Sequence, residues 1–284
     1  MTTFTKIKAI KDSLSTSELK LAKFVLSSSN AVRDLSSQEL ANVVGISQSS
    51  VVKFAQKLGY KGYPALKLGV IDALNITTTN INFHGKITLN DSFGLMSEKL
   101  LSSKVAVLTE TKNINEEAAF TQAVSYLKSA KRILICGSGG SALVGKDFSY
   151  QLQKLGMFAV QEPDGHAQLA YAATLSENDL LFAICESGST REIVNVVSQA
   201  RKNNSKIISI TRFGPTPISN MADVKLYSVA EEVSGRLSSI LARTAQEFIT
   251  DILFIAITQS SRQGRQGRQL LEKTNKVVSE FRQA

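Results

Sequence analysis

The spacing of apolar and polar positions changes once along this chain, near residue 131. Before that point apolar residues recur three and four apart; Leu21, Phe24 and Val25, for example, share one face of a helix. After it, short apolar runs alternate with stretches of helical spacing. The pattern predicts an all-α domain followed by an α/β domain with a doubly wound parallel sheet.

The expected elements of the second part alternate between strand and helix. Strands are predicted at residues 132–136, 158–161, 180–184, 206–210 and 224–227. Helices are predicted at about 141–155, 166–175, 190–203 and 217–221, then at about 234–259 and 269–282. Gly264 and Gly267 lie in the stretch that leads to the last helix.

An Asn/Thr-rich segment separates the two parts. Residues 73–90 show no helical periodicity, so we predict a helix-turn-helix domain over 1–75, a linker over 76–90 and a second domain over 91–284. Two more helices are expected at about 91–110 and 115–129, the latter starting at Asn115 with Glu116 and Glu117.

Composition narrows the class of protein. Hydrophobic residues make up 43% of the 284 residues, enough for packed cores. The start has no apolar signal segment and the longest apolar runs cannot span a bilayer, so no membrane association is expected. Cys136 and Cys185 end strand-like runs, which favours buried thiols in a cytoplasmic protein. Neither a metal site nor a cofactor is predicted.

The net charge of +9 is concentrated at the two ends. Residues 1–75 carry 10 Lys and Arg against 5 Asp and Glu, residues 76–261 carry 17 against 17, and residues 262–284 carry 6 against 2. A basic terminal domain is typical of nucleic-acid binding, although a merely solvated basic surface has the same composition.

Residues 36–59 have the spacing of a helix-turn-helix. Ser36 and Glu39 predict a capping box, Gly45 suits a turn that needs positive φ, and Ser47 can cap a second helix. A small residue, a glycine four later and a valine six further on is the helix-turn-helix pattern. The apolar faces are Leu40, Ala41 and Val44 in the first helix and Val51, Ala55 and Leu58 in the second.

The polar side of the second helix is where contact with double-stranded DNA is expected. Its first residues can reach base edges or phosphates, and its lysines can neutralise phosphates. The candidates are Ser47, Gln48, Ser49, Ser50, Lys53, Lys57 and Lys61. A plain helical hairpin is the alternative; the basic charge and the run Gly59-Tyr60-Lys61-Gly62-Tyr63-Pro64 favour DNA.

Two strand-to-helix turns of the second domain suit an anion, one rich in glycine and one rich in hydroxyls. At the carboxyl ends of parallel strands they would bracket a crevice for a phosphorylated small molecule. The candidates are Ser138, Gly139, Gly140 and Ser141, then Cys185, Glu186, Ser187, Gly188, Ser189 and Thr190, and His166 in a separate loop. A turn without ligand is the alternative for either one alone. A dinucleotide site ranks second, because no acidic residue closes the second strand as ribose binding would prefer, and Glu162 is the nearest candidate.

Arg243 and Glu247 stand one turn apart in the predicted long helix. They form either an ion pair or part of the site.

These residues resemble the RpiR family of transcriptional regulators, in which a helix-turn-helix precedes a sugar-isomerase (SIS) domain. The matching segments are Ser17-Glu18, Gly45-Ile46-Ser47, Ser50 to Phe54, Lys57 to Pro64 and Leu66-Lys67, then Gly139-Gly140-Ser141 and Ser187 to Thr190. The resemblance implies a regulator of sugar catabolism with a phosphorylated sugar as effector, in a homodimer or homotetramer. It also implies that Ser141 contacts the sugar and that Ser187 and Thr190 hold the phosphate, helped by the backbone of Gly188 and Ser189.

Three residues depart from the family pattern. Cys185 stands where these domains commonly have a phosphate-binding serine, which leaves its backbone N–H as the contributing group. Glu186 adds negative charge beside the expected phosphate. Lys53 stands where arginine is more usual and cannot read guanine bidentately.

The leading hypothesis is therefore a DNA-binding regulator that senses a phosphosugar and is not an enzyme. The alternative is a phosphosugar isomerase with an accessory helical domain, with His166, Glu186, Glu192, Glu231 or Glu232 as base. A general DNA-packaging protein would leave both polar turns unexplained.

Overall fold

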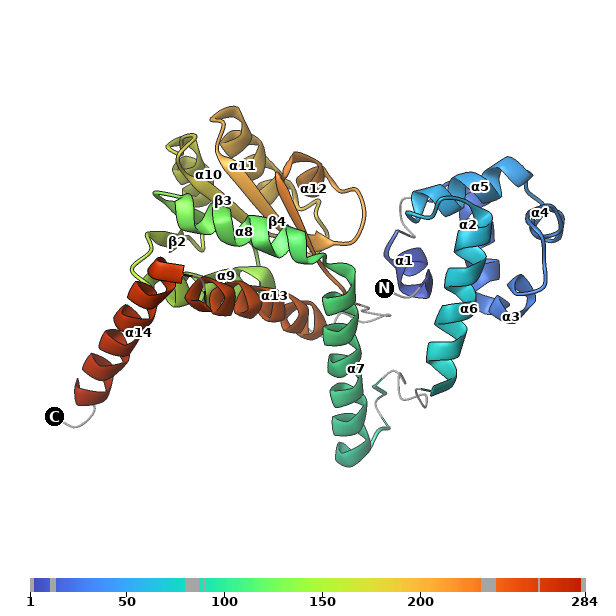
Figure 1. Ribbon diagram of the computed structural model, residues 1–284, viewed down its shortest axis with the longest axis horizontal. Helices are drawn as coiled ribbons and strands as arrows, with labels where there is room; N and C mark the ends of the chain where they lie inside the picture. Colours follow the sequence, from blue (N-terminus) through green and yellow to red (C-terminus); the bar gives the residue numbers. More distant parts are fainter. Residues whose placement is uncertain are drawn as a thin grey trace. The chain divides into compact units, whose positions relative to one another are not determined.

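The computed structural model describes residues 3–10, 14–79, 87–88, 90–230, 239–259 and 261–281 (Figure 1). The chain divides into two compact units, Met1–Ala106 and Val107–Ala284. The described residues of the first unit form helices and no strands, and the second unit is built on a parallel sheet. The predicted fold class is confirmed.

The described residues up to 79 form six helices, and the apolar sides of these helices pack together in one core. Leu21, Val25, Leu40, Val51 and Phe54 have no exposed surface. The helices are α1 (Thr3–Ala9), α2 (Thr16–Ser27), α3 (Ser29–Val32), α4 (Ser37–Val44), α5 (Gln48–Lys57) and α6 (Tyr63–Thr79).

The end of α6 differs from the sequence prediction. The helix continues to Thr79, through residues for which no helical periodicity was expected. Because a helix that has already formed adds residues cooperatively, a few Asn and Thr residues at its end do not stop it. The rest of the predicted linker falls largely outside the described residues. A 22-residue helix, α7 (Phe93–Ile114), then leads into the second unit.

In the described residues of the second unit, five parallel strands form a sheet in the order β2-β1-β3-β4-β5. They are β1 (Ile133–Cys136), β2 (Ala159–Gln161), β3 (Leu180–Ile184), β4 (Lys206–Arg212) and β5 (Val224–Ser228), each within two residues of its predicted bounds. β1 and β3 are neighbours, with Ile133 beside Leu180 and Cys136 beside Ala183. Both strands are fully buried, as their continuous apolar runs require.

Helices cover both faces of the sheet, which makes the fold doubly wound (Figure 1). On one face pack α8 (Glu117–Ser129), α9 (Gly140–Lys154) and α13 (Ile240–Gln259); on the other pack α10 (Gly165–Ala173), α11 (Arg191–Lys202) and α12 (Pro217–Met221). Figure 1 shows α14 (Ser261–Phe281) following α13. The predicted start of α13, near residue 234, lies outside the described residues.

Two local predictions differ from the structure. α14 begins at Ser261 and runs through Gly264 and Gly267, because the arginines and glutamines around them favour helix. Asn115 does not cap α8; its side chain donates to the carbonyl of Tyr227 on β5 at 2.7 Å and accepts from the Tyr227 N–H at 2.8 Å.

Candidate functional site

The turn between α4 and α5 has the geometry that its sequence predicts. Gly45 adopts a left-handed conformation with φ of 71°. Ser47 caps α5, its Oγ accepting from the N–H of Ser50 at 3.2 Å. Ala41 is fully buried, as are Val51 and Phe54. The helix-turn-helix is therefore held by its own caps and core, and the opposite side of α5 is left to solvent.

The predicted DNA-binding residues gather on this exposed side of α5 and the turn after it. Ser47, Ser49 and Ser50 form a hydroxyl cluster, with Oγ–Oγ distances of 2.9 Å and 2.8 Å from Ser47. Gln48 donates through Nε2 to Ser37 at 2.8 Å, which ties α5 to the start of α4. Lys53 and Lys61 are exposed.

Lys57 has a second role that the sequence reasoning missed. Its Nζ lies 3.0 Å from Oε2 of Glu18, which also accepts from the N–H of Ser15 at 2.7 Å in the capping box of α2. The ammonium group is thus partly neutralised within the unit. The helical spacing of α5 correctly predicted that Lys57 lies on the exposed face. The ion pair could not be predicted from neighbouring residues, because Glu18 lies 39 positions earlier in the chain.

The two polar turns of the second unit lie at the point where the strand order reverses. After β1 the chain forms α9 on one face of the sheet, and after β3 it forms α11 on the other. The turns are close, because a Cβ on Gly137 would lie 3.0 Å from the carbonyl oxygen of Ile184. A crevice at such a switch point is the general ligand position of open α/β sheets.

Three side chains of the turn after β3 converge at the start of α11. The Cys185 thiol donates to Oγ1 of Thr190 at 3.3 Å, and Oγ of Ser187 lies 3.3 Å from the same oxygen and 3.6 Å from the sulfur. Thr190 is the N-cap of α11, yet it makes no side-chain capping bond. The N-terminus of a 12-residue helix is therefore open beside three weakly engaged polar groups.

The backbone of this turn is already committed to the fold. The Cys185 N–H donates to the carbonyl of Ile210 at 2.9 Å, so the expectation that it serves a phosphate is wrong. The Gly188 N–H donates to the carbonyl of Cys185 at 3.0 Å, and the Ser189 N–H donates to Oγ of Ser187 at 3.3 Å. These groups shape the turn, whereas the hydroxyls of Ser187 and Thr190 face one another within it.

Gly188 is fixed by a neighbour that sequence reasoning did not identify. It has φ of 65°, and a Cβ there would lie 2.3 Å from Oγ1 of Thr216. Thr216 is the N-cap of α12 in a reciprocal capping box with Ser219, and both are buried. The Thr216-Pro-Ile-Ser219 motif is a local signal for that cap, but not for its contact with Gly188.

The turn after β1 has fewer polar side chains than the turn after β3. Ser138 is exposed, Gly139 is the N-cap of α9 with φ of 55° and no side-chain capping bond, and Ser141 is buried in the first turn. From α10, Gln168 supports this turn by donating to the carbonyl of Gly137 at 3.0 Å. The sequence did not single out Gln168, since a helical glutamine carries no distinctive signal.

The remaining candidates have different surroundings. His166 is exposed at the second position of α10, and Glu186 is half-buried with its carbonyl accepting from the Arg212 N–H at 2.8 Å. Arg243 and Glu247 form no ion pair in the described parts of the chain, and their place in the site stays a prediction. Glu247 is exposed, whereas the Cγ and Cδ atoms of Arg243 lie 3.3 Å from where a Cβ of Gly140 would be.

Comparison with known proteins identifies both units. The helix-turn-helix domain model of the rpiR family matches residues 1–76, and the SIS domain model matches residues 126–256. The uncharacterized HTH-type transcriptional regulator YfhH of Escherichia coli is 41% identical over 256 residues, 89% of this chain and 91% of YfhH. The chain belongs to the RpiR family of transcriptional regulators.

Two solved structures share the fold of this RpiR-family protein. NanR of Vibrio vulnificus, complexed with ManNAc-6P, is 22% identical with a TM-score of 0.62, and the match covers 98% of both chains. The sugar isomerase domain of an RpiR transcription factor from Sphaerobacter thermophilus is 19% identical with a TM-score of 0.58, covering 64% of this chain and 98% of that one.

Both cysteines of this RpiR-family protein are free and buried. Burial, with a smaller contribution from the neighbouring Cys185 thiol, raises the pKa of Cys136 far above its ordinary value. The Cys136 thiol is therefore unreactive, as its strand position predicted. Among the described residues no cluster of His, Cys, Asp and Glu could hold a metal ion, and no helix is long and apolar enough to cross a membrane.

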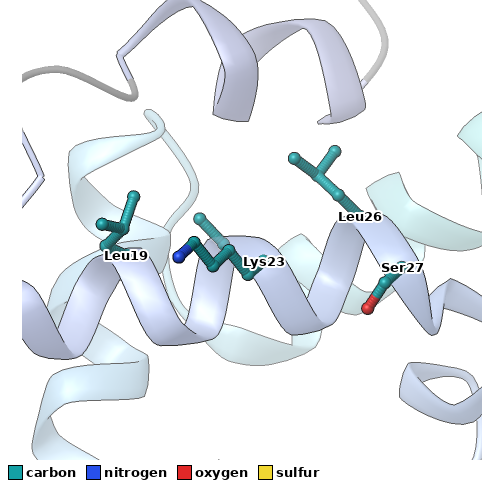
Figure 2. Close-up of a pocket in the computed structure, with 5 residues that line it drawn as sticks. Leu19, Lys23, Leu26 and Ser27 are labelled. Atoms are coloured by element: carbon teal, nitrogen blue, oxygen red, sulfur yellow. The ribbon is translucent and has the colours of Figure 1, made fainter.

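A separate hollow of about 340 Å³ runs along α2 in the first unit (Figure 2). Figure 2 shows Leu19 and Leu26 projecting from the same side of this helix. The lining residues are Leu19, Ala22, Lys23, Leu26 and Ser27, none of which belongs to the predicted DNA or ligand sites.

Proposed function

We propose that this regulator controls sugar metabolism by binding a DNA operator through α5, and that a phosphorylated sugar bound at the switch point changes that binding. The observation that carries the proposal is the open N-terminus of α11 beside the Cys185, Ser187 and Thr190 side chains. A helix N-terminus with nearby hydroxyls is a ready phosphate site. NanR, which shares the fold, is bound to ManNAc-6P in its solved structure.

Within this site the groups have distinct roles. The hydroxyls of Ser187 and Thr190 and the first-turn N–H groups of α11 hold the phosphate, while Ser138 and Ser141 at the start of α9 contact the sugar. Gly139 lets the ligand approach the backbone closely, and Gly140 brings the start of α9 against Arg243. Cys185 acts as a weak donor to Thr190 and does not touch the phosphate through its N–H. His166, Glu186 and Ser189 serve as contacts at the rim.

In the DNA-binding unit, Ser47 to Ser50 contact base edges and phosphates, and Lys53, Lys57 and Lys61 neutralise phosphates. The protein acts as a homodimer or homotetramer in the cytoplasm. A two-fold axis presents two copies of α5 to half-sites about 34 Å apart, one helical turn of DNA. The effector alters the relation between the two copies, which is a coupling between sites and not a reaction.

The test measures DNA binding by fluorescence anisotropy at fixed salt, on fragments upstream of the regulator's own and neighbouring genes. A panel of sugar phosphates is added to the full chain. We expect one fragment to bind specifically and one compound to change its affinity at least about ten-fold. The double variant Ser187→Ala, Thr190→Val should keep DNA affinity and lose the response, whereas Ser129→Ala should keep both.

Three results would contradict the proposal. They are binding that no fragment competes for, a response that survives the double variant, and turnover of a sugar phosphate between its aldose and ketose forms. The last result would favour the isomerase alternative.

A further inference from the structure

The start of α9 brings together more positive charge than the proposed site has yet used. Arg243 lies in the first turn of α13, and its Cγ and Cδ atoms are 3.3 Å from the position of a Cβ on Gly140. The Cβ of Ser239, which directly precedes α13, lies at the same distance of 3.3 Å. The N-termini of α9 and α13 and the Arg243 side chain therefore meet at one glycine.

No described residue forms an ion pair with Arg243 or caps the N-terminus of α9 with its side chain. Nε of Arg243 is buried and has no hydrogen-bond partner. Glu247, one turn further along α13, is exposed and forms no ion pair with Arg243 in the described parts of the chain. Gly139, the N-cap of α9, supplies no side chain to close that helix end.

The electrostatics of this meeting point favour an anion. Each helix N-terminus carries the equivalent of about half a positive charge, and the guanidinium adds a full one. The uncapped N-terminus of α9 and the guanidinium of Arg243, whose Nε has no partner, are both positive, so a bound group that carries a full negative charge stabilises the arrangement far more than a neutral hydroxyl. A planar guanidinium can donate two parallel hydrogen bonds to a carboxylate or to a phosphate, so the choice between them depends on where the phosphate of the ligand lies.

The phosphate already has a place at the neighbouring turn. That place is the N-terminus of α11 with Ser187 and Thr190, and the turns after β1 and β3 are adjacent. An extended ligand whose phosphate lies on α11 can therefore present its other end to Gly140 and Arg243.

We infer that Arg243 is a specificity-determining residue of the effector site and holds a carboxylate, so that the effector is a phosphorylated sugar acid. This inference rests on the proposed function. It assigns the phosphate and the second anionic group to different turns of the same crevice. Gly140 is then required for space, since any side chain there would lie against the stem of Arg243.

The test compares two compounds that differ at one carbon. Gluconate 6-phosphate and glucitol 6-phosphate share their chain and phosphate, but the first carries a carboxylate where the second has a hydroxymethyl group. Isothermal titration of the full chain should show the acid binding about 10- to 100-fold more tightly, the range for a charge-assisted bidentate pair. Arg243→Gln should reduce this preference to about two-fold by weakening the acid alone, and Arg243→Lys should retain part of it.

The variants should remain folded, because no described residue depends on the Arg243 side chain for a hydrogen bond; thermal unfolding checks this. Equal affinity of the wild type for both compounds overturns the inference and leaves the proposed function standing. Equal weakening of both compounds in Arg243→Gln also overturns it, since Arg243 would then hold the phosphate. If neither compound binds, the sugar-acid assignment is wrong; if no phosphosugar of the larger panel binds either, the proposed function fails with it.

Discussion

Ser47 and Thr190 occupy equivalent positions in the two units, each as the N-cap of the helix that follows a turn, but only one of them caps. Oγ of Ser47 accepts from the Ser50 N–H at 3.2 Å and closes α5. Thr190 makes no such bond to α11, and its hydroxyl instead accepts from the Cys185 thiol at 3.3 Å. A hydroxyl residue at the N-cap therefore stabilises the helix in the first unit, as Ser47 does, whereas Thr190 in the second unit leaves the N–H groups at the start of α11 uncapped.

The difference extends to other helices of each unit. In the first, α2 and α4 both begin with complete capping boxes, Ser15 with Glu18 and Ser36 with Glu39. In the second, α9 and α11, which follow the two polar turns, begin without a side-chain cap, whereas α10 and α12 are capped by Asp164 and Thr216. A DNA-binding unit needs a rigid helix that presents its side chains, whereas a ligand site built on backbone N–H groups needs open helix ends.

The largest expected effect is the difference in stability between two glycine-to-alanine variants, one in each polar turn: Gly188→Ala and Gly139→Ala. Both glycines have positive φ, but a Cβ on Gly188 would meet Thr216 at 2.3 Å, whereas one on Gly139 meets nothing within 4 Å. Gly188→Ala should lower the free energy of unfolding by about 3–5 kcal/mol, combining conformational strain with overpacking. Gly139→Ala should cost only about 1–3 kcal/mol, from backbone strain alone.

Urea denaturation of the full chain measures both variants. Gly165→Ala is the control, because Gly165 has neither a positive φ nor a neighbour within 4 Å of its added Cβ. Equal losses for Gly188→Ala and Gly139→Ala would mean that the contact with Thr216 does not constrain the turn.

Removing the two N-cap hydroxyls should have opposite consequences. Ser47→Ala should destabilise the protein by about 1 kcal/mol, the usual value of a lost cap. Thr190→Val removes no cap, so the free energy of unfolding should change by less than about 0.5 kcal/mol while phosphosugar affinity falls about ten-fold. Chemical denaturation measures the free energy of unfolding of both variants, and calorimetric titration measures their phosphosugar affinity. A stability loss in Thr190→Val as large as in Ser47→Ala would show that Thr190 also caps its helix.

Whether a structural feature could be predicted from the sequence depends on how far apart in the chain its interacting residues lie. The Ser36 box, the cap at Ser47 and the positive φ of Gly45 depend on neighbours within a few residues, and all were predicted. Strand positions followed from continuous apolar runs. The boundary predictions that differed, at α6 and α14, are places where helix propagation extends through unfavourable residues.

Features that depend on distant partners could not be predicted. Asn115 binds the backbone of Tyr227, 112 residues later, instead of capping α8. The Cys185 N–H is taken by Ile210 on the neighbouring strand, and Gly188 is confined by Thr216. In each case the residue type was informative but its partner was set by the order of strands, which sequence periodicity does not contain.

Lys53 and Lys57 of α5 should contribute differently to the salt dependence of DNA binding. Lys53 is exposed on α5, whereas the Lys57 ammonium lies 3.0 Å from the Glu18 carboxylate. Lys53→Ala should therefore reduce the slope of log affinity against log salt by about 0.9, the value for one phosphate contact. Lys57→Ala should reduce it less, and Glu18→Gln should steepen it by releasing Lys57. Equal slopes for the two lysine variants in anisotropy titrations would show that the ion pair opens when DNA binds.

The smallest effect expected concerns the carboxylate that closes α2. Burial alone would raise the pKa of Glu18, but the Ser15 N–H, together with Lys57 and the Ser15 hydroxyl, outweighs it and holds that pKa below its ordinary value. A carboxylate with a depressed folded pKa stabilises the protein fully above its unfolded pKa, about 4.3 for glutamate, and this stabilisation is lost as the pH falls through the folded value. Hydrogen exchange of the α2 amides between pH 6 and 3 should thus show protection decreasing below about pH 4.3 in the wild type and less in Glu18→Gln. Because α11 carries no such cap, Thr190→Val should leave the acid dependence of α11 amides unchanged, so a self-capped helix and an open one would be distinguished by pH alone.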